Sequence, residues 1–143
     1  MKMAYVILIT ILFLSCNAEP EQLRYGIDAC YVCKMTLVDK KFGAELVTAK
    51  GKIYKFDDVN CIVKFITSDY LIDETIAHTL IVDYAQPEKL IPAEKAFYLK
   101  SEEIRSPMAS QVAAFETEEV MLKYKPTLHA KSLSWGELVN QFR

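Results

Sequence analysis

Two segments of the chain carry apolar residues at helical spacing, and each follows a short strand-like run. Apolar residues at positions 59, 62, 63 and 66 recur with the period of an α-helix, and positions 135, 138, 139 and 142 repeat the spacing. Asp57 can cap the first helix by accepting from its free N–H groups. Ser134 and Glu137 form a capping-box pattern at the start of the second helix. Both segments therefore predict a strand that leads into a capped helix.

Strand patterns surround these helices. Residues 42–50 and 52–56 predict the two strands of a hairpin that turns at Gly51. Further elements follow downstream: strands over 75–83, 96–100 and 131–133, and a short helix over 116–124 capped by Thr117. Strands mixed with few helices predict an α+β fold. The repeated layout predicts two small related ββα-type modules with mainly antiparallel strands, roughly 27–85 and 95–143.

The first 15 residues have the pattern of an export signal. A basic start is followed by an unbroken apolar run from Ala4 to Leu14, which is shorter than the ~20 residues of a membrane-spanning helix. Ser15 and Cys16 end the run in a way that resembles a bacterial lipoprotein signal, implying cleavage before Cys16 and lipid attachment to its thiol. An ordinary signal peptide with an incidental Cys16 is the alternative.

The sequence after Cys16 completes this organisation. Residues 16–26 predict a lipid-anchored tether, and residues 27–143 predict the folded domain. Asn17, directly after the modified cysteine, favours the outer membrane by analogy with enterobacterial sorting. We therefore expect a membrane-anchored lipoprotein that faces the periplasm.

Charge argues against one class of partner. The formal net charge of the chain is −2, and removal of residues 1–15 takes away Lys2 and leaves −3. The sequence has no Lys/Arg-rich run and no basic stripe. Nucleic acid is therefore not an expected partner.

The strongest chemical pattern is the run Cys30-Tyr31-Val32-Cys33-Lys34-Met35. Thiolate and thioether are soft ligands that select Cu(I), whereas zinc sites rarely use methionine. Once Cys16 is modified, Cys30, Cys33 and Cys61 remain, so at most one disulfide can form. The pattern favours copper binding, with a Cys30–Cys33 disulfide as the main alternative.

Individual roles follow from local geometry. In an extended segment, Cys33 and Met35 would point the same way and share one ion. Cys30 is a second candidate thiolate, a redox partner or a structural residue. Met108, after Pro107, is a candidate ligand in a place comparable to the cysteine run but in the second module. His129 is a candidate nitrogen ligand before the last strand and helix.

Other residues are predicted to be structural. Cys61 lies off the centre of the first apolar stripe, so we expect a partly buried helix residue without chemistry. His78 lies within a continuous strand pattern and is expected to be structural. Trp135 and Phe142 belong to the second apolar stripe and are expected in the core.

The chain resembles the NosL family, the lipoprotein accessory proteins of nitrous oxide reductase. The residues that carry the resemblance are Cys16, Asp28-x-Cys30-x-x-Cys33-x-Met35, Phe42-Gly43-Ala44-Glu45-Leu46, Lys55-Phe56-Asp57-Asp58, Ser106-Pro107-Met108 and Ala113-Ala114-Phe115. The family usually has glycine between the second cysteine and the methionine, where this chain has Lys34.

The resemblance implies a Cu(I)-binding chaperone with no catalysed reaction. Its expected partner is nitrous oxide reductase or the copper-assembly complex of that enzyme. It also implies an α+β fold of two related ββα-containing modules. A thiol–disulfide oxidoreductase that uses Cys30 and Cys33 is the alternative, although the motif lies outside any βαβ pattern and gives Met35 no role. A zinc-stabilised structural module is a weaker alternative, because no second cysteine pair lies nearby.

Overall fold

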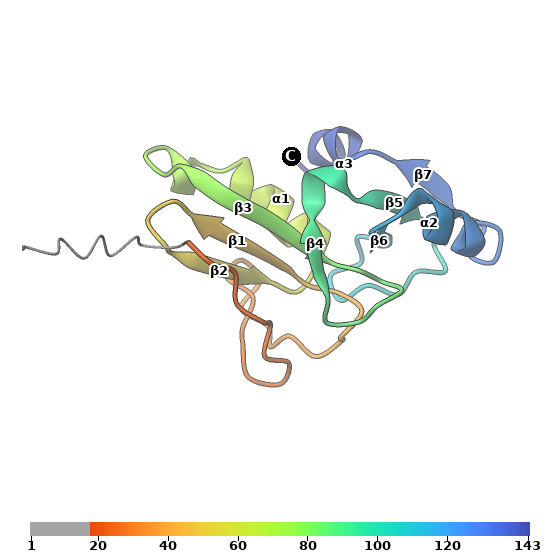
Figure 1. The fold of residues 1–143 in the computed structure, drawn as a ribbon, viewed down its shortest axis with the longest axis horizontal. Helices are drawn as coiled ribbons and strands as arrows, with labels where there is room; N and C mark the ends of the chain where they lie inside the picture. Colours follow the sequence, from red (N-terminus) through yellow and green to blue (C-terminus); the bar gives the residue numbers. More distant parts are fainter. Residues whose placement is uncertain (1–17) are drawn as a thin grey trace, which may run out of the picture.

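Two antiparallel sheets and three helices make up the fold (Figure 1). The computed structural model describes residues 18–143, so the predicted signal segment and Cys16 lie outside the described residues. In chain order the elements are β1 (Ala44–Thr48), β2 (Ile53–Phe56), α1 (Val59–Ile66), η1 (Asp69–Leu71), β3 (Ile76–Val82), β4 (Leu90–Pro92), η2 (Ala93–Lys95), β5 (Phe97–Lys100), β6 (Val112–Phe115), α2 (Glu118–Tyr124), β7 (Lys131–Leu133) and α3 (Trp135–Phe142).

The two sheets repeat one topology. The first has the strand order β2-β1-β3-β4 and the second β6-β5-β7, with every pair antiparallel. Each half runs strand, strand, helix, strand, and its first strand lies between the other two. The predicted α+β fold of two related modules is therefore confirmed.

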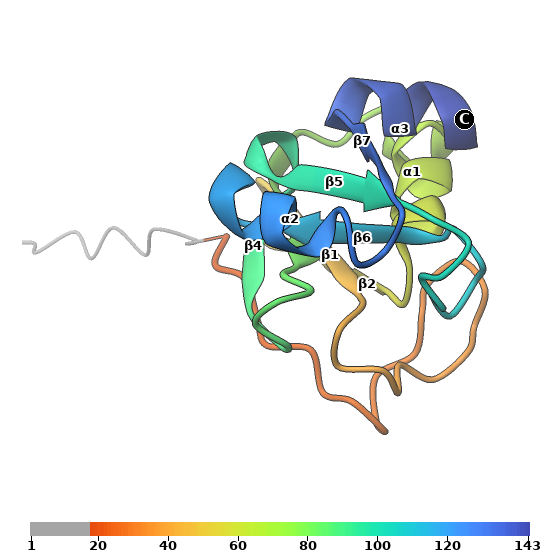
Figure 2. The same ribbon diagram turned by 90° about the vertical axis from the view of Figure 1, so that its right-hand side faces the viewer.

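The correspondence of the helices differs from the prediction. By topology the counterpart of α1 is α2, whereas the sequence pattern paired α1 with α3. The reason is that α1 and α3 pack together and contribute to the same core, as Figure 2 shows. Their common apolar spacing therefore reports a shared buried face and not an equivalent place in the two modules.

The two modules are joined into one body. The N–H of Tyr84 donates to the carbonyl of Ala114 at 2.8 Å, and Asp83 forms a parallel bridge with Ala114. The larger core cluster crosses this junction, since it contains Phe56 of the first module and Leu138 of α3. The strands and helices thus present one continuous support for the loops at their ends.

Most predicted elements are present, with shifted ends. The expected hairpin, the central strand of residues 76–82 and the helix capped by Thr117 are confirmed, as is the Ser134–Glu137 capping box. The first helix is capped by Asp58, whose carboxylate accepts from the N–H of Val59, so the prediction of Asp57 as the cap was wrong. Asp57 points to the candidate site instead.

The aromatic residues of the last helix lie where the apolar stripe predicts. Trp135 and Phe142 are both half-buried against the larger core. The Trp135 ring stacks on Tyr98 with centroids 6.0 Å apart. His78 is an exposed residue on β3 opposite Val47.

An N-terminal strap, residues 21–37, lies along the first sheet (Figure 1). The N–H of Glu21 donates to Glu45 Oε1 at 2.9 Å, which fixes the start of the strap to the buried strand β1. Leu23 enters the core beside Gly43, where an added Cβ would lie 2.6 Å from Leu23 Cδ1. Gly43, with φ of +128°, therefore allows the strap to approach the sheet.

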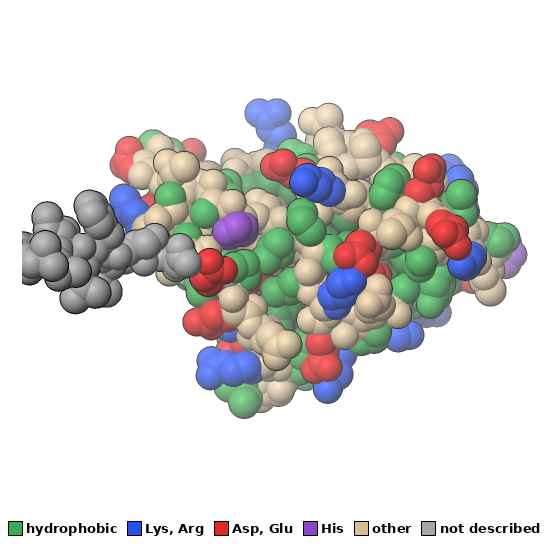
Figure 3. Space-filling model, viewed as in Figure 1, with side chains coloured by type: hydrophobic (Ala, Val, Ile, Leu, Met, Phe, Trp, Pro, Cys, Tyr) green, Lys and Arg blue, Asp and Glu red, His purple; other side chains and the backbone are tan. Residues whose placement is uncertain are grey.

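The surface carries mixed charge. On the face shown in Figure 3, basic and acidic side chains alternate and neither sign forms a large area. Within residues 18–143, no helix has the length and apolar content needed to cross a bilayer.

Candidate metal centre

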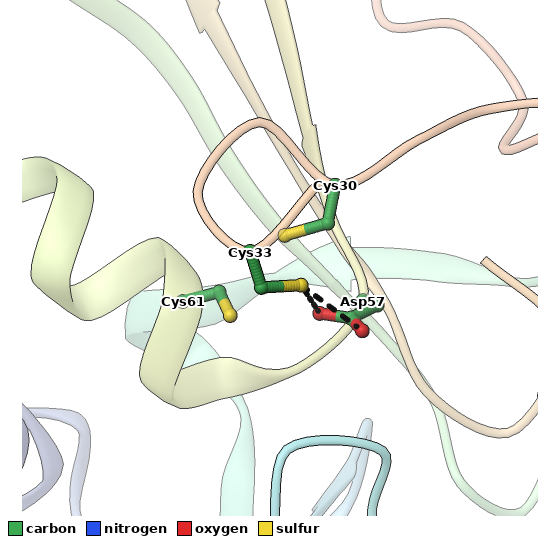
Figure 4. Close-up of side chains that lie close together, drawn as sticks. All are labelled: Cys30, Cys33, Asp57 and Cys61. Carbon is green, nitrogen blue, oxygen red and sulfur yellow. Dashed lines mark hydrogen bonds between the residues drawn. The ribbon is translucent and has the colours of Figure 1, made fainter. Parts of the chain in front are cut away.

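Three thiols and one carboxylate converge at one end of the first module. The Sγ atoms of Cys30, Cys33 and Cys61 and a carboxylate oxygen of Asp57 all lie within 4.8 Å of one another. All three cysteines are free thiols. Figure 4 shows that Cys30 and Cys33 come from the strap, Cys61 from α1 and Asp57 from the connection between β2 and α1.

Residues 30–35, the cysteine loop, form a closed turn and not an extended segment. The N–H of Cys30 donates to the carbonyl of Met35 at 2.8 Å, and the N–H of Lys34 donates to the carbonyl of Cys30 at 3.0 Å. Lys34 has φ of +65°, in the left-handed region that favours glycine. The predicted extended backbone from Cys33 to Met35 was therefore wrong. The turn instead directs Cys33 toward Cys30.

The loop is attached to the sheet through its own backbone and through a buried ion pair. The N–H of Tyr31 donates to the carbonyl of Lys55 at 2.8 Å. Lys55 Nζ lies 2.8 Å from Asp28 Oδ2, and Arg24 also pairs with Asp28. Burial alone would raise the pKa of Asp28, but the hydrogen bonds from Arg24 and Lys55 lower it to about 2. The carboxylate therefore stays charged and keeps the loop in place across the physiological pH range.

The opposite wall of the site is set by the start of α1. Asp58 caps the helix, so Cys61 falls in its first turn and points into the cluster. The buried Asp58 carboxylate also accepts from the Ser106 hydroxyl at 2.8 Å and from the N–H of Met108 at 2.9 Å. One carboxylate thus fixes both the helix start and the loop that follows β5.

The three thiols have unequal proton affinities. A hydrogen bond from Cys61 lowers the pKa of Cys30 to about 6, assisted by backbone N–H groups that include that of Cys33, although burial opposes the shift. The same interaction, together with burial, raises the pKa of Cys61. Burial raises the pKa of Cys33 to about 11. Cys30 is therefore the thiolate of the cluster at neutral pH, and Cys61 and Cys33 hold protons.

Cys33 is the thiol nearest to solvent. Cys30 is 0% exposed and Cys61 is 2% exposed, whereas Cys33 is half-buried. The Cys33 thiol donates to the Asp57 carboxylate, with Sγ 3.4 Å from Oδ1. Met35, two residues further along the loop, is 52% exposed. An ion can therefore be reached from the Cys33 side while the other two sulfurs stay covered.

Of the five residues predicted as metal ligands, Cys30 and Cys33 are brought together, and Met35 lies on the same loop. Met108 lies in the β5–β6 connection, inside the second module, so the predicted correspondence with the cysteine run, which precedes the first module, was wrong. It is half-buried against the larger core, and its carbonyl accepts from the side chain of Asn60 at 2.8 Å. Its backbone is therefore tied to α1.

His129 is not part of the converging group. Its exposed Nδ1 lies 2.6 Å from Glu103 Oε1. Together with Lys100 and Lys131 it lines a separate surface pocket of about 590 Å³.

Sequence reasoning missed two members of the cluster. Cys61 was predicted to be a partly buried helix residue without chemistry, whereas the structure buries it fully and turns its sulfur toward those of Cys30 and Cys33, where the three could hold one ion. Asp57 was assigned as a helix cap. The odd count of mature cysteines was the available signal for Cys61. The adjacent acidic pair Asp57–Asp58 left the choice of cap ambiguous, because only one of two neighbouring carboxylates can fill that role.

Comparison with known proteins assigns the family. Residues 25–138 match the sequence profile of NosL. The chain belongs to the NosL family. No curated protein sequence matches the chain. Among solved structures, the crystal structure of the copper chaperone NosL from Shewanella denitrificans matches with a TM-score of 0.69 and 14% sequence identity. The match covers 84% of this chain and 95% of that chain, and at this identity it shows a shared fold.

The NosL-like motifs of this chain have structural explanations. Gly43 makes room for Leu23, and Lys55 pairs with Asp28 below the cysteine loop. The left-handed backbone at Lys34 accounts for the glycine that NosL proteins usually have at this position. The motifs therefore describe the support of the thiol cluster as well as the thiols themselves.

Proposed function

We propose that this protein is a membrane-anchored metallochaperone that binds Cu(I) and supplies it during maturation of nitrous oxide reductase. The observation that carries the proposal is the convergence of Cys30, Cys33 and Cys61 within 4.8 Å. Sulfur donors favour Cu(I) over hard cations, and thiolates bind it best. Membership of the NosL family and the fold shared with a copper chaperone support the same conclusion.

The arrangement suits a protein that must release its cargo. Cys30 offers a thiolate that is already ionised at neutral pH, and Cys33 loses its proton to the solvent as the ion binds. Cys61 is close enough to provide a third sulfur. Because Cys33 and Met35 lie at the solvent side, ligands of a receiving protein can displace them first. Stepwise exchange of this kind needs no catalysed reaction.

The central test is Cu(I) titration of the reduced protein without oxygen. We expect one Cu(I) per chain in the parent, loss of that binding in Cys33→Ser and weaker binding in Met35→Leu. His129→Ala is the matched control, because His129 pairs with Glu103 outside the cluster. Parent-like affinity in Cys33→Ser would show that the site assignment is wrong. Weaker Cu(I) binding in His129→Ala would show that His129 is a ligand.

Zinc is the competing ion for this donor set, since three thiolates and a carboxylate also suit Zn²⁺. A competition experiment with both ions separates the two cases. We expect Cu(I) to displace Zn²⁺ from the reduced protein at equal concentrations. Retention of Zn²⁺ under these conditions would contradict the copper assignment.

The membrane anchor is tested independently of copper. We expect the parent protein in the membrane fraction and Cys16→Ala in the soluble fraction, because the modified thiol would carry the lipid. The parent and the variant should bind Cu(I) equally well. Equal membrane partitioning of the two proteins would remove the lipid from the proposal without affecting the metal centre.

A further inference from the structure

An apolar groove opens beside the cysteine loop. Its volume is about 210 Å³, and its walls come from two separate segments. Tyr31 and Val32 belong to the loop that carries Cys33, whereas Phe65 lies in the last turn of α1 and Tyr70 belongs to η1. The Tyr31 and Phe65 rings meet edge-to-face with centroids 5.2 Å apart, and Tyr70 stacks on Phe65 at 5.7 Å. The groove therefore has aromatic walls directly next to the cysteine loop.

Large apolar side chains around the groove remain in contact with water. Tyr70 is 70% exposed and Ile72, in the turn after η1, is 75% exposed. Val32 and Met35 of the cysteine loop are exposed as well. Soluble proteins rarely leave several such residues together on the surface unless the area is used for binding. Tyrosine is also among the residues that most often dominate the energy of an interface.

The rim of the groove carries two positive charges. Lys34 and Lys64 both line it. Lys34 Nζ lies 4.4 Å above the Tyr31 ring and donates to the Tyr31 carbonyl, so the charge is fixed at the edge of the groove. Within residues 18–143, neither lysine forms an ion pair. Asp69 lines a separate depression with Ser68 and Tyr70.

We propose that this groove is the docking surface for the protein that receives the copper, and that the docked surface of that protein is apolar and bordered by carboxylates. The inference rests on the proposed function, because it assigns a partner to the same site. The ligands of an acceptor protein can reach an ion on Cys33 only if the acceptor surface around those ligands covers the cysteine loop. That loop supplies Tyr31 and Val32 to the groove wall. Lys34 and Lys64 select an acidic border by charge complementarity.

Docking and copper release can be measured separately with two acceptors. The copper-loaded protein is mixed either with copper-free nitrous oxide reductase or with the uncharged Cu(I) chelator neocuproine, and the transfer rate is followed in each case. We expect Lys64→Glu to slow transfer to the enzyme by about tenfold at low ionic strength, because the steering charge is reversed. Added salt should reduce the difference in transfer rate between the parent and Lys64→Glu. Transfer to neocuproine should stay unchanged.

Two further variants complete the design. Tyr70→Ser removes an exposed aromatic side chain of the groove and should slow transfer to the enzyme at every salt concentration. Lys131→Glu makes the same charge change on β7, away from the groove, and should transfer at the parent rate. Each variant should bind Cu(I) with parent affinity, which shows that the metal centre is intact.

The outcomes separate the two proposals. A parent protein that binds no Cu(I) overturns the proposed function itself. If the parent delivers copper to the enzyme and Lys64→Glu and Tyr70→Ser deliver it equally fast, the docking surface is wrong while the chaperone function stands. Equal slowing by Lys131→Glu would also overturn the inference, because net charge and not the groove would then control the rate.

Discussion

The affinity for Cu(I) should rise steeply with pH, with a slope set by the protons that the thiols hold. The perturbation is a pH series from 5 to 9 on the reduced parent protein. Burial raises the pKa of Cys33 to about 11, so this thiol is protonated throughout the range. Cys30, with a pKa near 6, is ionised above neutral pH. Binding between pH 7 and 9 should therefore release one proton from Cys33.

The magnitude follows from this proton count. Release of one proton makes the apparent affinity rise tenfold per pH unit, or about 1.4 kcal/mol, so pH 9 should bind about a hundredfold more tightly than pH 7. Below pH 6 the protonation of Cys30 adds a second proton, and the slope should double. The sign is the same in both ranges, because protons compete with the ion for each thiolate.

The assay is competition against a chromophoric Cu(I) chelator whose own protonation has been measured. A flat affinity between pH 7 and 9 would refute the reasoning, since no protonated thiol would then take part. A hundredfold rise in Cu(I) affinity per pH unit in this range would show that Cys61 also binds as a thiolate.

Paired variants at Cys61 test the cause of the low pKa of Cys30. Cys61→Ser keeps a hydrogen-bond donor, so the slope of Cu(I) affinity against pH should still change near pH 6. Cys61→Ala removes the donor and should move the change of slope to higher pH, because the Cys30 thiolate loses its main stabilising contact. An unchanged profile in Cys61→Ala would assign the shift to the backbone N–H groups instead.

Three other predictions concern the support of the site and the competing function. Asp58→Ala should lower the free energy of unfolding by about 3–5 kcal/mol in urea titrations, because it removes a helix cap and takes the acceptor from the half-buried donors of Ser106 and Met108 and from the buried Ser110 hydroxyl. A loss below about 1 kcal/mol would contradict this role. Lys34→Gly should raise stability by up to about 1 kcal/mol, since the left-handed backbone costs lysine more than glycine; a lower melting temperature would refute the account. In an insulin-reduction assay the protein should stay at background, and sustained turnover would favour the oxidoreductase that uses Cys30 and Cys33.

The fold was predictable where local chemistry determines it. Thr117 and Ser134 cap their helices as expected, because capping depends on neighbouring residues. The strand β6 was not predicted, since its centre is Ala113-Ala114 and alanine has low strand preference. It forms because β5 supplies an antiparallel partner and because its four residues are buried between the modules. Tertiary packing therefore makes this segment a strand, although its local residue preference does not predict one.

The metal centre was predictable in part for a similar reason. The spacing of Cys30, Cys33 and Met35 is a local pattern and pointed to soft-metal chemistry. Cys61 joins the cluster only through the docking of the strap onto the start of α1, which no local pattern encodes. The turn at Lys34 was also hidden, because lysine gives no sign of a left-handed backbone. The resemblance to NosL proteins, through their usual glycine, was the available indication of that turn.

The contact between Glu21 and Glu45 limits how far the folded domain can lie from a lipid on Cys16. It makes the folded body begin five residues after Cys16, and five extended residues span at most about 18 Å. A lipid on Cys16 would therefore hold the whole domain, with a radius of gyration of about 14 Å, in a thin layer against the bilayer. The anchored domain would meet acceptor proteins by moving along the membrane surface, where the effective concentration is high. Acceptors whose copper sites open close to the same membrane would be within range, and those far from it would be excluded by geometry alone.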